Sequence, residues 1–218
     1  MNTPIDDFVR AYAQSGTIRA HMPGHKGRGE GPERWDITEL TGADSLYEAD
    51  GIIRESEENA GKLYGSGITV YSAEGSSLSI RTMLLLALRR RKPAGERPWL
   101  LAGRNAHRTL MSAAALLDFD IRWIDNSEFG IRNSELDGIN TIHSSFLIPH
   151  SSLNDQGILS NSLSLTALES ALSAADSQPF AVYLTSPDYL GGMADIRAAA
   201  RICHEHDVLL LVDNAHGA

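Results

Sequence analysis

The amino-acid sequence predicts an α/β fold, a mostly parallel sheet with helices on both faces. Short apolar runs alternate with amphipathic segments, as at residues 180–185, 195–206 and 208–212, and this alternation is typical of right-handed βαβ units. The run at 208–212 is apolar throughout, which indicates a parallel strand buried on both faces. Because open α/β sheets bind ligands at the carboxyl ends of their strands, Asp213, which follows this run, is the first candidate functional residue. A plain turn at the end of a strand explains it about as well.

The first third of the chain predicts two helices around a long irregular stretch. Pro4 follows a threonine N-cap and precedes two acidic residues, which predicts a helix to about residue 15. Residues 17–51 lack periodicity, but they carry aromatic and aliphatic side chains, so we expect an ordered loop of functional importance. A second helix is expected at residues 55–64, ended by Gly65.

The rest of the chain alternates strands and helices, which are recognised by their periodicity and by the turn residues between them. Leu84 and Leu86 are both among the residues expected in the core, and Thr166 with Glu169 resembles a capping box. The polar segment 125–162 is poorly periodic. The expected strands are residues 68–72, 99–102, 121–124, 141–148, 180–185 and 208–212, and the expected helices are residues 76–91, 107–117, 166–175 and 195–206.

Composition and charge exclude several classes of function. The 218 residues carry a net charge of −9 without a long run of one sign, which argues against nucleic acids and anionic membranes as partners. Residues 1–7 do not resemble a signal peptide, and no apolar stretch approaches the roughly 20 residues of a membrane span, so we expect a cytoplasmic protein. Cys203 is the only cysteine; we expect a packed thiol, no disulfide and no metal site.

Three further loops follow expected strands and gather at the same edge of the sheet as the strand-end aspartate. Gly75, Ser76 and Ser77 open a helix, where hydroxyl groups beside helix N–H groups suit a phosphate; a serine-capped helix start is the alternative. His107 suits stacking on a planar ligand, or it is a solvated histidine at a helix start. Ser186 begins a loop that offers a hydroxyl and a phenol, or that is a plain Pro/Gly turn.

Together these four places suit pyridoxal phosphate, a molecule that is phosphorylated, planar and nitrogen-containing. A phosphate cradle, a stacking imidazole and a strand-end carboxylate match its three recognition elements. A carboxylate beside the ring nitrogen keeps that nitrogen protonated, and the pyridinium then acts as an electron sink for a carbanion. The sequence therefore predicts a pyridoxal-phosphate site at the carboxyl edge of the sheet.

Six short motifs, in order along the chain, resemble the Orn/Lys/Arg decarboxylases of the aspartate-aminotransferase fold. The resemblance covers nearly the whole chain, and the first and last motifs are its most specific parts. The motifs are His-Met-Pro-Gly-His-Lys-Gly at residues 21–27, Asp-Ile-Thr-Glu-Leu-Thr-Gly at 36–42, Leu-Tyr-Gly-Ser at 63–66, Gly-Ser-Ser at 75–77, Arg-Asn-Ala-His-Arg at 104–108 and Val-Asp-Asn-Ala-His-Gly at 212–217.

The resemblance implies a role for each motif residue at the cofactor. Gly75, Ser76 and Ser77 would hold the phosphate. His107 would stack on the ring, and Asp213 would pair with the pyridine nitrogen; these two are the expected catalytic residues. Ala215 would pack on the opposite ring face, with His216 beside it. Ser186 would lie near the ring or its phenolic oxygen.

The resemblance also implies how the chain is divided. Residues 1–52 would form an N-terminal helix and an active-site and dimer-interface segment, and residues 53–218 the N-terminal, incomplete part of the large domain that binds the cofactor. The residues expected at the active-site entrance and the interface are His21, Pro23, Gly24, His25 and Lys26.

Two positions depart from the family pattern, and one family residue is missing. Asn214 stands where the family usually has glutamate, and Asp188 where it usually has threonine, which adds a negative charge beside the expected cofactor site. The Schiff-base lysine of the family lies beyond the last motif, and Lys26, Lys62 and Lys92 fit its position poorly. Alone, the chain is therefore expected to bind pyridoxal phosphate weakly at best and not to catalyse.

The expected function is decarboxylation of a basic amino acid, namely lysine, arginine or ornithine, by the intact enzyme. The expected partners are this small molecule and a second copy of the chain, in a homodimer or a higher oligomer. One alternative keeps the fold but changes the reaction, to an aminotransferase or a carbon–sulfur lyase. Another is a degenerate, non-catalytic domain that acts through association.

Overall fold

The computed structural model describes residues 1–91, 97–124, 152–153, 159–160 and 164–217. The expected strand at 141–148 and Lys92 lie outside these residues. The chain forms two compact units, Met1–Ala73 and Glu74–Ala218, which are described separately. The predicted division after residue 52 falls within the first unit.

The first unit contains α1 (Pro4–Gln14), a short 3-10 helix η1 (Pro32–Arg34) and α2 (Ile52–Tyr64). The helix α1 has the predicted bounds. The helix α2 begins earlier than predicted, because a side chain from the preceding loop completes its first turn. Asp44 accepts hydrogen bonds from the N–H groups of Gly51 and Ile53 at 2.9 and 3.0 Å.

The Asp44 carboxylate is held by four backbone N–H groups, those of Ser45, Asp50, Gly51 and Ile53. Desolvation raises the pKa of this carboxyl group, but the four hydrogen bonds outweigh it and lower the pKa to about 2. Because the pKa is lower in the folded state, the ionised carboxylate stabilises the fold at pH values above 3.8, its ordinary pKa. This contribution is lost as the pH falls through about 2.

We therefore expect D44A to lower the thermal midpoint of the first unit at pH 6 and to lower it much less at pH 2. Circular dichroism melts of the wild-type protein and the variant, at both pH values, measure this difference. The control is E48A, which removes an exposed carboxylate from the same loop and should change neither midpoint. A D44A effect of equal size at both pH values would contradict this role of the carboxylate.

The strand predicted at residues 68–72 does not form, and this prediction was wrong. Ile68 and Val70 are 85% and 75% exposed, so the apolar residues of this segment do not reach a core. The N–H of Tyr71 donates to Glu57 Oε1 at 2.8 Å, and its hydroxyl bonds Ser56 on the same helix. The side chains of α2 thus take the place that a neighbouring strand would occupy.

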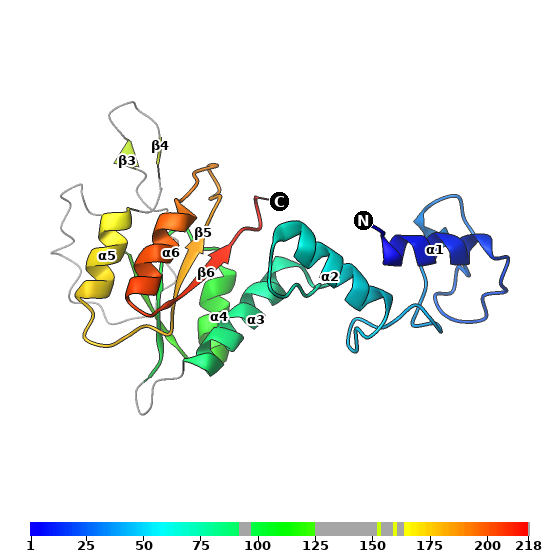
Figure 1. Cartoon of the computed structure of the whole chain (residues 1–218), viewed down its shortest axis with the longest axis horizontal. Helices are drawn as coiled ribbons and strands as arrows, with labels where there is room; N and C mark the ends of the chain where they lie inside the picture. The colour runs from blue at the N-terminus through cyan, green and yellow to red at the C-terminus, as the bar shows by residue number, and fades with distance from the viewer. Residues whose placement is uncertain (92–96, 125–151, 154–158, 161–163, 218) are drawn as a thin grey trace. The chain divides into compact units, whose positions relative to one another are not determined.

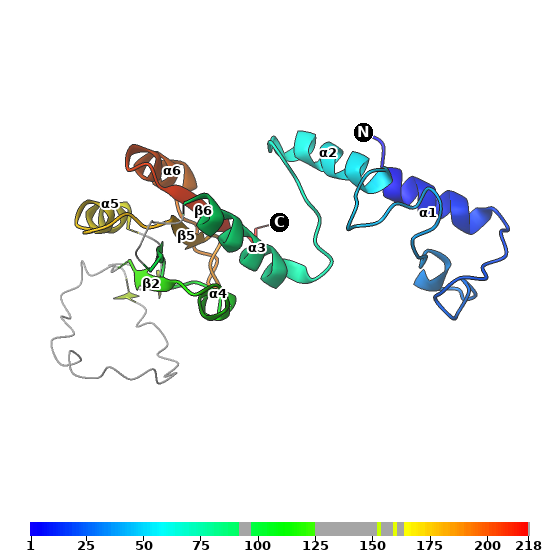
Figure 2. The ribbon, with the colours of Figure 1, turned by 90° about the horizontal axis from the view of Figure 1, so that it is seen from below.

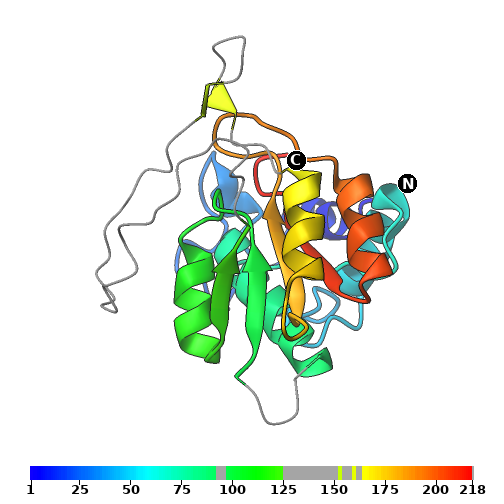
Figure 3. The same cartoon turned by 90° about the vertical axis from the view of Figure 1, so that its left-hand side faces the viewer.

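The second unit is built on a four-stranded parallel sheet in the order β2-β1-β5-β6 (Figures 1 and 3). Its strands are β1 (Trp99–Ala102), β2 (Asp120–Trp123), β5 (Ala181–Thr185) and β6 (Leu209–Asp213). A separate antiparallel pair joins β3 (Ser152–Leu153) and β4 (Leu159–Ser160). The predicted parallel α/β sheet is confirmed. Within the described residues β6 pairs with β5 alone, so one of its edges is open for pairing.

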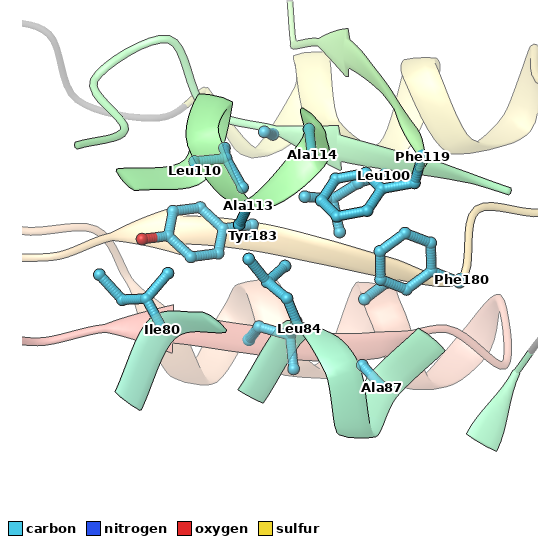
Figure 4. Close-up of a cluster of buried hydrophobic side chains, with 13 residues drawn as sticks. Ile80, Leu84, Ala87, Leu100, Leu110, Ala113, Ala114, Phe119, Phe180 and Tyr183 are labelled. Carbon is cyan, nitrogen blue, oxygen red and sulfur yellow. The ribbon is translucent and has the colours of Figure 1, made fainter. Parts of the chain in front are cut away.

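Helices cover both faces of this sheet, as predicted. Figure 2 shows α3 (Gly75–Arg90) and α4 (Thr109–Leu117) on one side, and α5 (Leu165–Ser173) and α6 (Ile196–Glu205) on the other. Alternate residues of each strand serve the two faces: in β1, Leu100 packs towards α3 and α4, whereas Leu101 packs towards α5 and α6. The core on the α3 and α4 side is drawn in Figure 4.

The helices of the second unit differ from the sequence predictions at one buried position and at one helix cap. Leu84 of α3 is fully buried, but Leu86 is 60% exposed, contrary to the prediction, because two residues along a helix turn the side chain to the opposite face. The helix α5 is capped by Ser164, whose Oγ accepts from the N–H of Ala167, and not by the predicted Thr166. Cys203 is buried as expected, and burial raises the pKa of its thiol to about 11.

None of the helices in the described part of the chain is long and apolar enough to cross a membrane. Within the same residues, no cluster of three or more histidine, cysteine, aspartate or glutamate side chains is arranged to hold a metal ion.

Candidate active site

Buried polar side chains concentrate at the carboxyl edge of the sheet. The described residues include six buried polar or charged side chains, and five of them lie at the ends of β5 and β6, in the loop after β5 or at the start of α4. Burying such groups costs free energy unless they are paired, so a concentration of them at one edge indicates a functional site. The five residues are Thr109, Thr185, Ser186, Asp188 and Asp213.

Asp213 is the last residue of β6 and is only 6% exposed. It lies opposite Thr185 in the register of the β5–β6 pair. Its Oδ2 accepts a hydrogen bond from the Tyr183 hydroxyl at 2.8 Å, and its Oδ1 accepts one from the N–H of Ala215 at 3.2 Å. Because Tyr183 packs in the core beneath α3 and α4 (Figure 4), the carboxylate belongs to the face of the sheet that these two helices cover.

His107, in the loop before α4, is connected to the start of α3 through hydroxyl groups. Its Nδ1 contacts Thr109 Oγ1 at 2.8 Å, and Thr109 Oγ1 contacts Ser77 Oγ at 3.1 Å. The N–H of Thr109 also donates to Nδ1, at 3.2 Å. Since a backbone N–H only donates, Nδ1 accepts, and the neutral imidazole carries its proton on Nε2. The chain of contacts brings the predicted ring-stacking and phosphate-binding residues together.

The helix α3 begins at Gly75, whose φ of +69° lies in the region that favours glycine. A Cβ at this position would meet no atom within 4 Å. Glycine is therefore favoured here by the backbone conformation and not by a lack of space for a side chain. Ser76 is exposed and Ser77 is half-buried. This turn presents the N–H groups and hydroxyls of a helix N-terminus, the arrangement that binds phosphate in many proteins.

Three aromatic rings line up across the site. The rings of His107 and Tyr189 have centroids 6.5 Å apart, and those of Tyr189 and His216 are 5.1 Å apart. Tyr189 is 61% exposed. It therefore lies between the predicted histidines of two different loops, with which it forms tilted ring contacts.

The loop after β5 is closed by its own polar side chains. The Oγ of Ser186 accepts from the N–H of Ala194 at 3.1 Å, and Asp188 Oδ1 accepts from the N–H groups of Leu190 and Gly192 at 2.9 and 2.7 Å. The negative charge of Asp188 is thus satisfied within the loop. This side chain shapes the turn, which accounts for an aspartate at a position where the family usually has threonine.

Thr185, at the end of β5, has a buried hydroxyl beside the Tyr183 phenol. By strand alternation it points to the same face as Tyr183, two residues earlier. Its carbonyl oxygen accepts from Asn105 Nδ2 at 3.3 Å, which ties the β1 loop to the end of β5. A buried hydroxyl beside Asp213 suits a ligand atom.

The predicted entrance segment belongs to the first unit and is folded upon itself. His21 Nε2 contacts the Tyr12 hydroxyl at 2.9 Å, and the Lys26 ammonium donates to the carbonyl oxygen of His21. His25 accepts from the N–H of Gly27 on Nδ1 and contacts Asp36 Oδ2 with Nε2 at 3.1 Å. Pro23 and Gly24 form the turn between the two histidines. The role of this segment at an active-site entrance stays a prediction.

Sequence reasoning missed three residues of this edge, Thr109, Tyr183 and Thr185, whereas it included the Tyr189 phenol in the loop that begins at Ser186. Tyr183 and Thr185 lie inside the apolar run that predicts β5, where periodicity marks them as core residues. The one signal that points to Thr109 is its position two residues after the predicted His107.

The fold and this edge define an α/β protein whose strand-end site combines a helix N-terminus, a histidine and a buried carboxylate. Residues 3–218 match the family model described as Orn/Lys/Arg decarboxylase, major domain, and the chain belongs to this family.

Similar proteins agree with this assignment. The chain is 28% identical to the arginine decarboxylase of Halalkalibacterium halodurans over 228 residues, covering 99% of the chain and 40% of the relative. It is also 28% identical to the arginine decarboxylase of Bacillus subtilis strain 168, over 232 residues and with the same coverage. The chain thus spans about two-fifths of the length of these relatives. The crystal structure of mouse CSAD resembles it with a TM-score of 0.52 and 22% identity, over 74% of this chain and 31% of that one, which supports the fold.

Proposed function

We propose that this chain forms the cofactor-holding part of a pyridoxal-phosphate-dependent decarboxylase that acts on arginine, lysine or ornithine. The family membership supports the reaction class, and the relatives named arginine decarboxylase favour arginine among the three substrates. The observation that carries the proposal is the buried Asp213 carboxylate on the same face of the sheet as the start of α3.

The residues at this edge fit the cofactor on structural grounds. A pyridine nitrogen needs an anion that is shielded from water, and Asp213 is a buried carboxylate at a strand end. A phosphate needs N–H and hydroxyl donors, and the first turn of α3 supplies both. The buried Thr185 hydroxyl lies at the same edge, opposite Asp213 in the strand register, where it can contact the polar substituents of such a ring.

Each of these residues then has a defined task. Asp213 holds a proton on the ring nitrogen, and His107 with Tyr189 covers a ring face and excludes water from it. Gly75, Ser76 and Ser77 bind and orient the phosphate. When bound, pyridoxal phosphate supplies an electron sink that accepts the electron pair of the Cα–carboxylate bond as CO₂ leaves.

The proposal also covers what the other expected residues do. Ala215 lies one residue before His216 in the turn after β6, a position from which a small side chain can contact the second ring face, and Ser186 closes the loop beside the ring. The entrance segment, the homodimer or higher oligomer, and the cytoplasmic location are part of the proposal by family resemblance.

The reaction class is tested by product analysis on the intact protein that carries this chain. With pyridoxal phosphate and carboxyl-labelled arginine, lysine or ornithine, we expect labelled CO₂ and the matching amine from one of the three, with arginine the first to be tried. Keto-acid formation without CO₂ would contradict decarboxylation and favour an aminotransferase. Absence of any product, together with absence of cofactor absorbance, would favour a non-catalytic domain.

A further inference from the structure

Tyr183 is a buried phenol in contact with the strand-end carboxylate. It occupies the middle of β5 and has no exposed surface. Figure 4 shows its ring among Ile80, Leu84 and Leu110, with the hydroxyl at one end of the cluster. That hydroxyl donates to Asp213 Oδ2 at 2.8 Å. The phenol thus reaches from the apolar core to the edge where the cofactor is proposed to bind.

The direction of this hydrogen bond is fixed by the surroundings of the phenol. Burial raises the pKa of the Tyr183 hydroxyl far above its usual value, and the hydrogen bond to Asp213 raises it further. The hydroxyl is therefore the donor in its hydrogen bond to Asp213. A donor that faces a carboxylate stabilises the ionised form of that carboxylate.

The arrangement fixes the plane of the carboxylate and leaves acceptor capacity on it. Tyr183 holds Oδ2, and the N–H of Ala215 holds Oδ1. Each carboxylate oxygen accepts about two hydrogen bonds, so both retain a lone pair for a ligand. A buried phenol needs a hydrogen-bond acceptor, but a backbone carbonyl would serve without the cost of desolvating a charge. The need of the phenol for an acceptor therefore does not by itself explain a carboxylate at this position.

We propose that Tyr183 is the positioning residue of Asp213: its hydrogen bond fixes the plane of the carboxylate, so that the remaining lone pairs face the ring nitrogen of a bound pyridoxal phosphate and hold the proton there. This inference rests on the proposed function. Without the phenol, the carboxylate loses the hydrogen bond that fixes its plane, and its contact with the ring nitrogen weakens.

The test uses the intact protein and 4′-deoxypyridoxine 5′-phosphate labelled with ¹⁵N in the ring. This probe keeps the ring nitrogen and the phosphate but cannot form a Schiff base, so its binding is independent of a lysine and of turnover. We expect the ¹⁵N chemical shift of the bound probe to lie in the protonated range in the wild-type protein. In Y183F it should move towards the neutral pyridine value, and the affinity should fall roughly tenfold.

The control variant is Y71F, which removes a tyrosine hydroxyl that bonds Ser56 in the first unit; neither the shift nor the affinity should change. A second variant carries 3-fluorotyrosine at position 183. Its more acidic hydroxyl donates more strongly, so the ¹⁵N shift should move further into the protonated range, opposite to Y183F. The fluorotyrosine variant tests the proposal even if Y183F fails to fold. It keeps the ring in place and changes the donor strength of the hydroxyl, so a role of Tyr183 in packing alone predicts no change in the ¹⁵N shift.

The inference is overturned if Y183F or the fluorotyrosine variant binds the probe with the wild-type shift and affinity. Failure of the wild-type protein to bind the probe at all would contradict the proposed function itself. The two failures are thus distinguishable in one series of spectra.

Discussion

Replacing Asp213 with alanine should lower the turnover of the intact enzyme about a thousandfold, which corresponds to roughly 4 kcal/mol in the activation free energy. The side chain is buried at the carboxyl end of β6 and receives two hydrogen bonds that orient it. Without the carboxylate, the ring nitrogen loses the anion that keeps it protonated, and the electron sink is weakened. Steady-state kinetics with saturating pyridoxal phosphate measure the loss.

The matched control is D207N, near the other end of the same strand. Asp207 forms an exposed ion pair with Arg91 at 2.8 Å, and exposed pairs contribute little to stability, so kcat should stay within about twofold of the wild-type value. A D213A variant that keeps most of its turnover would refute the role of this residue. Equal losses in D213A and D207N would instead indicate a general effect of negative charge around β6.

The second large effect is on stability. L84A should lower the free energy of unfolding by about 2–5 kcal/mol, because it opens a cavity in the core between α3 and the sheet. L86A, two residues further along the same helix, should change it by less than about 0.5 kcal/mol, since its side chain is 60% exposed. Urea unfolding followed by circular dichroism compares the two variants. Similar losses would show that this face of α3 is packed differently.

These two leucines also show how far the sequence predicts the fold. The six apolar residues at positions 83–88 predict a buried helix, but they do not reveal which face is buried. That choice depends on the sheet against which α3 packs. The strands β1, β5 and β6 are predictable because each is largely a short apolar run, whereas β2 alternates polar and apolar residues. The segment at 68–72 has the same local pattern, yet α2 provides its hydrogen-bond partners through Glu57 and Ser56.

The start of α2 also depends on a contact that the local sequence does not reveal. Its N-terminal N–H groups are satisfied by Asp44, seven or more residues upstream, whereas sequence rules for helix starts inspect the adjacent residues alone. Tertiary contacts of this kind shift boundaries without changing the element.

The candidate site also contains residues that the sequence predicts and residues that it does not. His107, Asp213 and the Gly75–Ser77 turn are recognisable because they follow strands in motifs with definite spacing. Tyr183 is not, because a tyrosine in an apolar strand is indistinguishable from a packing residue until the register places its hydroxyl beside the carboxylate. Residues that support a site from within the core leave no local pattern.

The most direct measurement is a crystal structure of the intact protein with pyridoxal phosphate bound. We expect the phosphate at the first turn of α3, within hydrogen-bond distance of Ser76 or Ser77, and the ring nitrogen beside the carboxylate of Asp213. A cofactor bound elsewhere, or one whose ring nitrogen faces away from Asp213 while its phosphate lies at α3, would contradict this expectation.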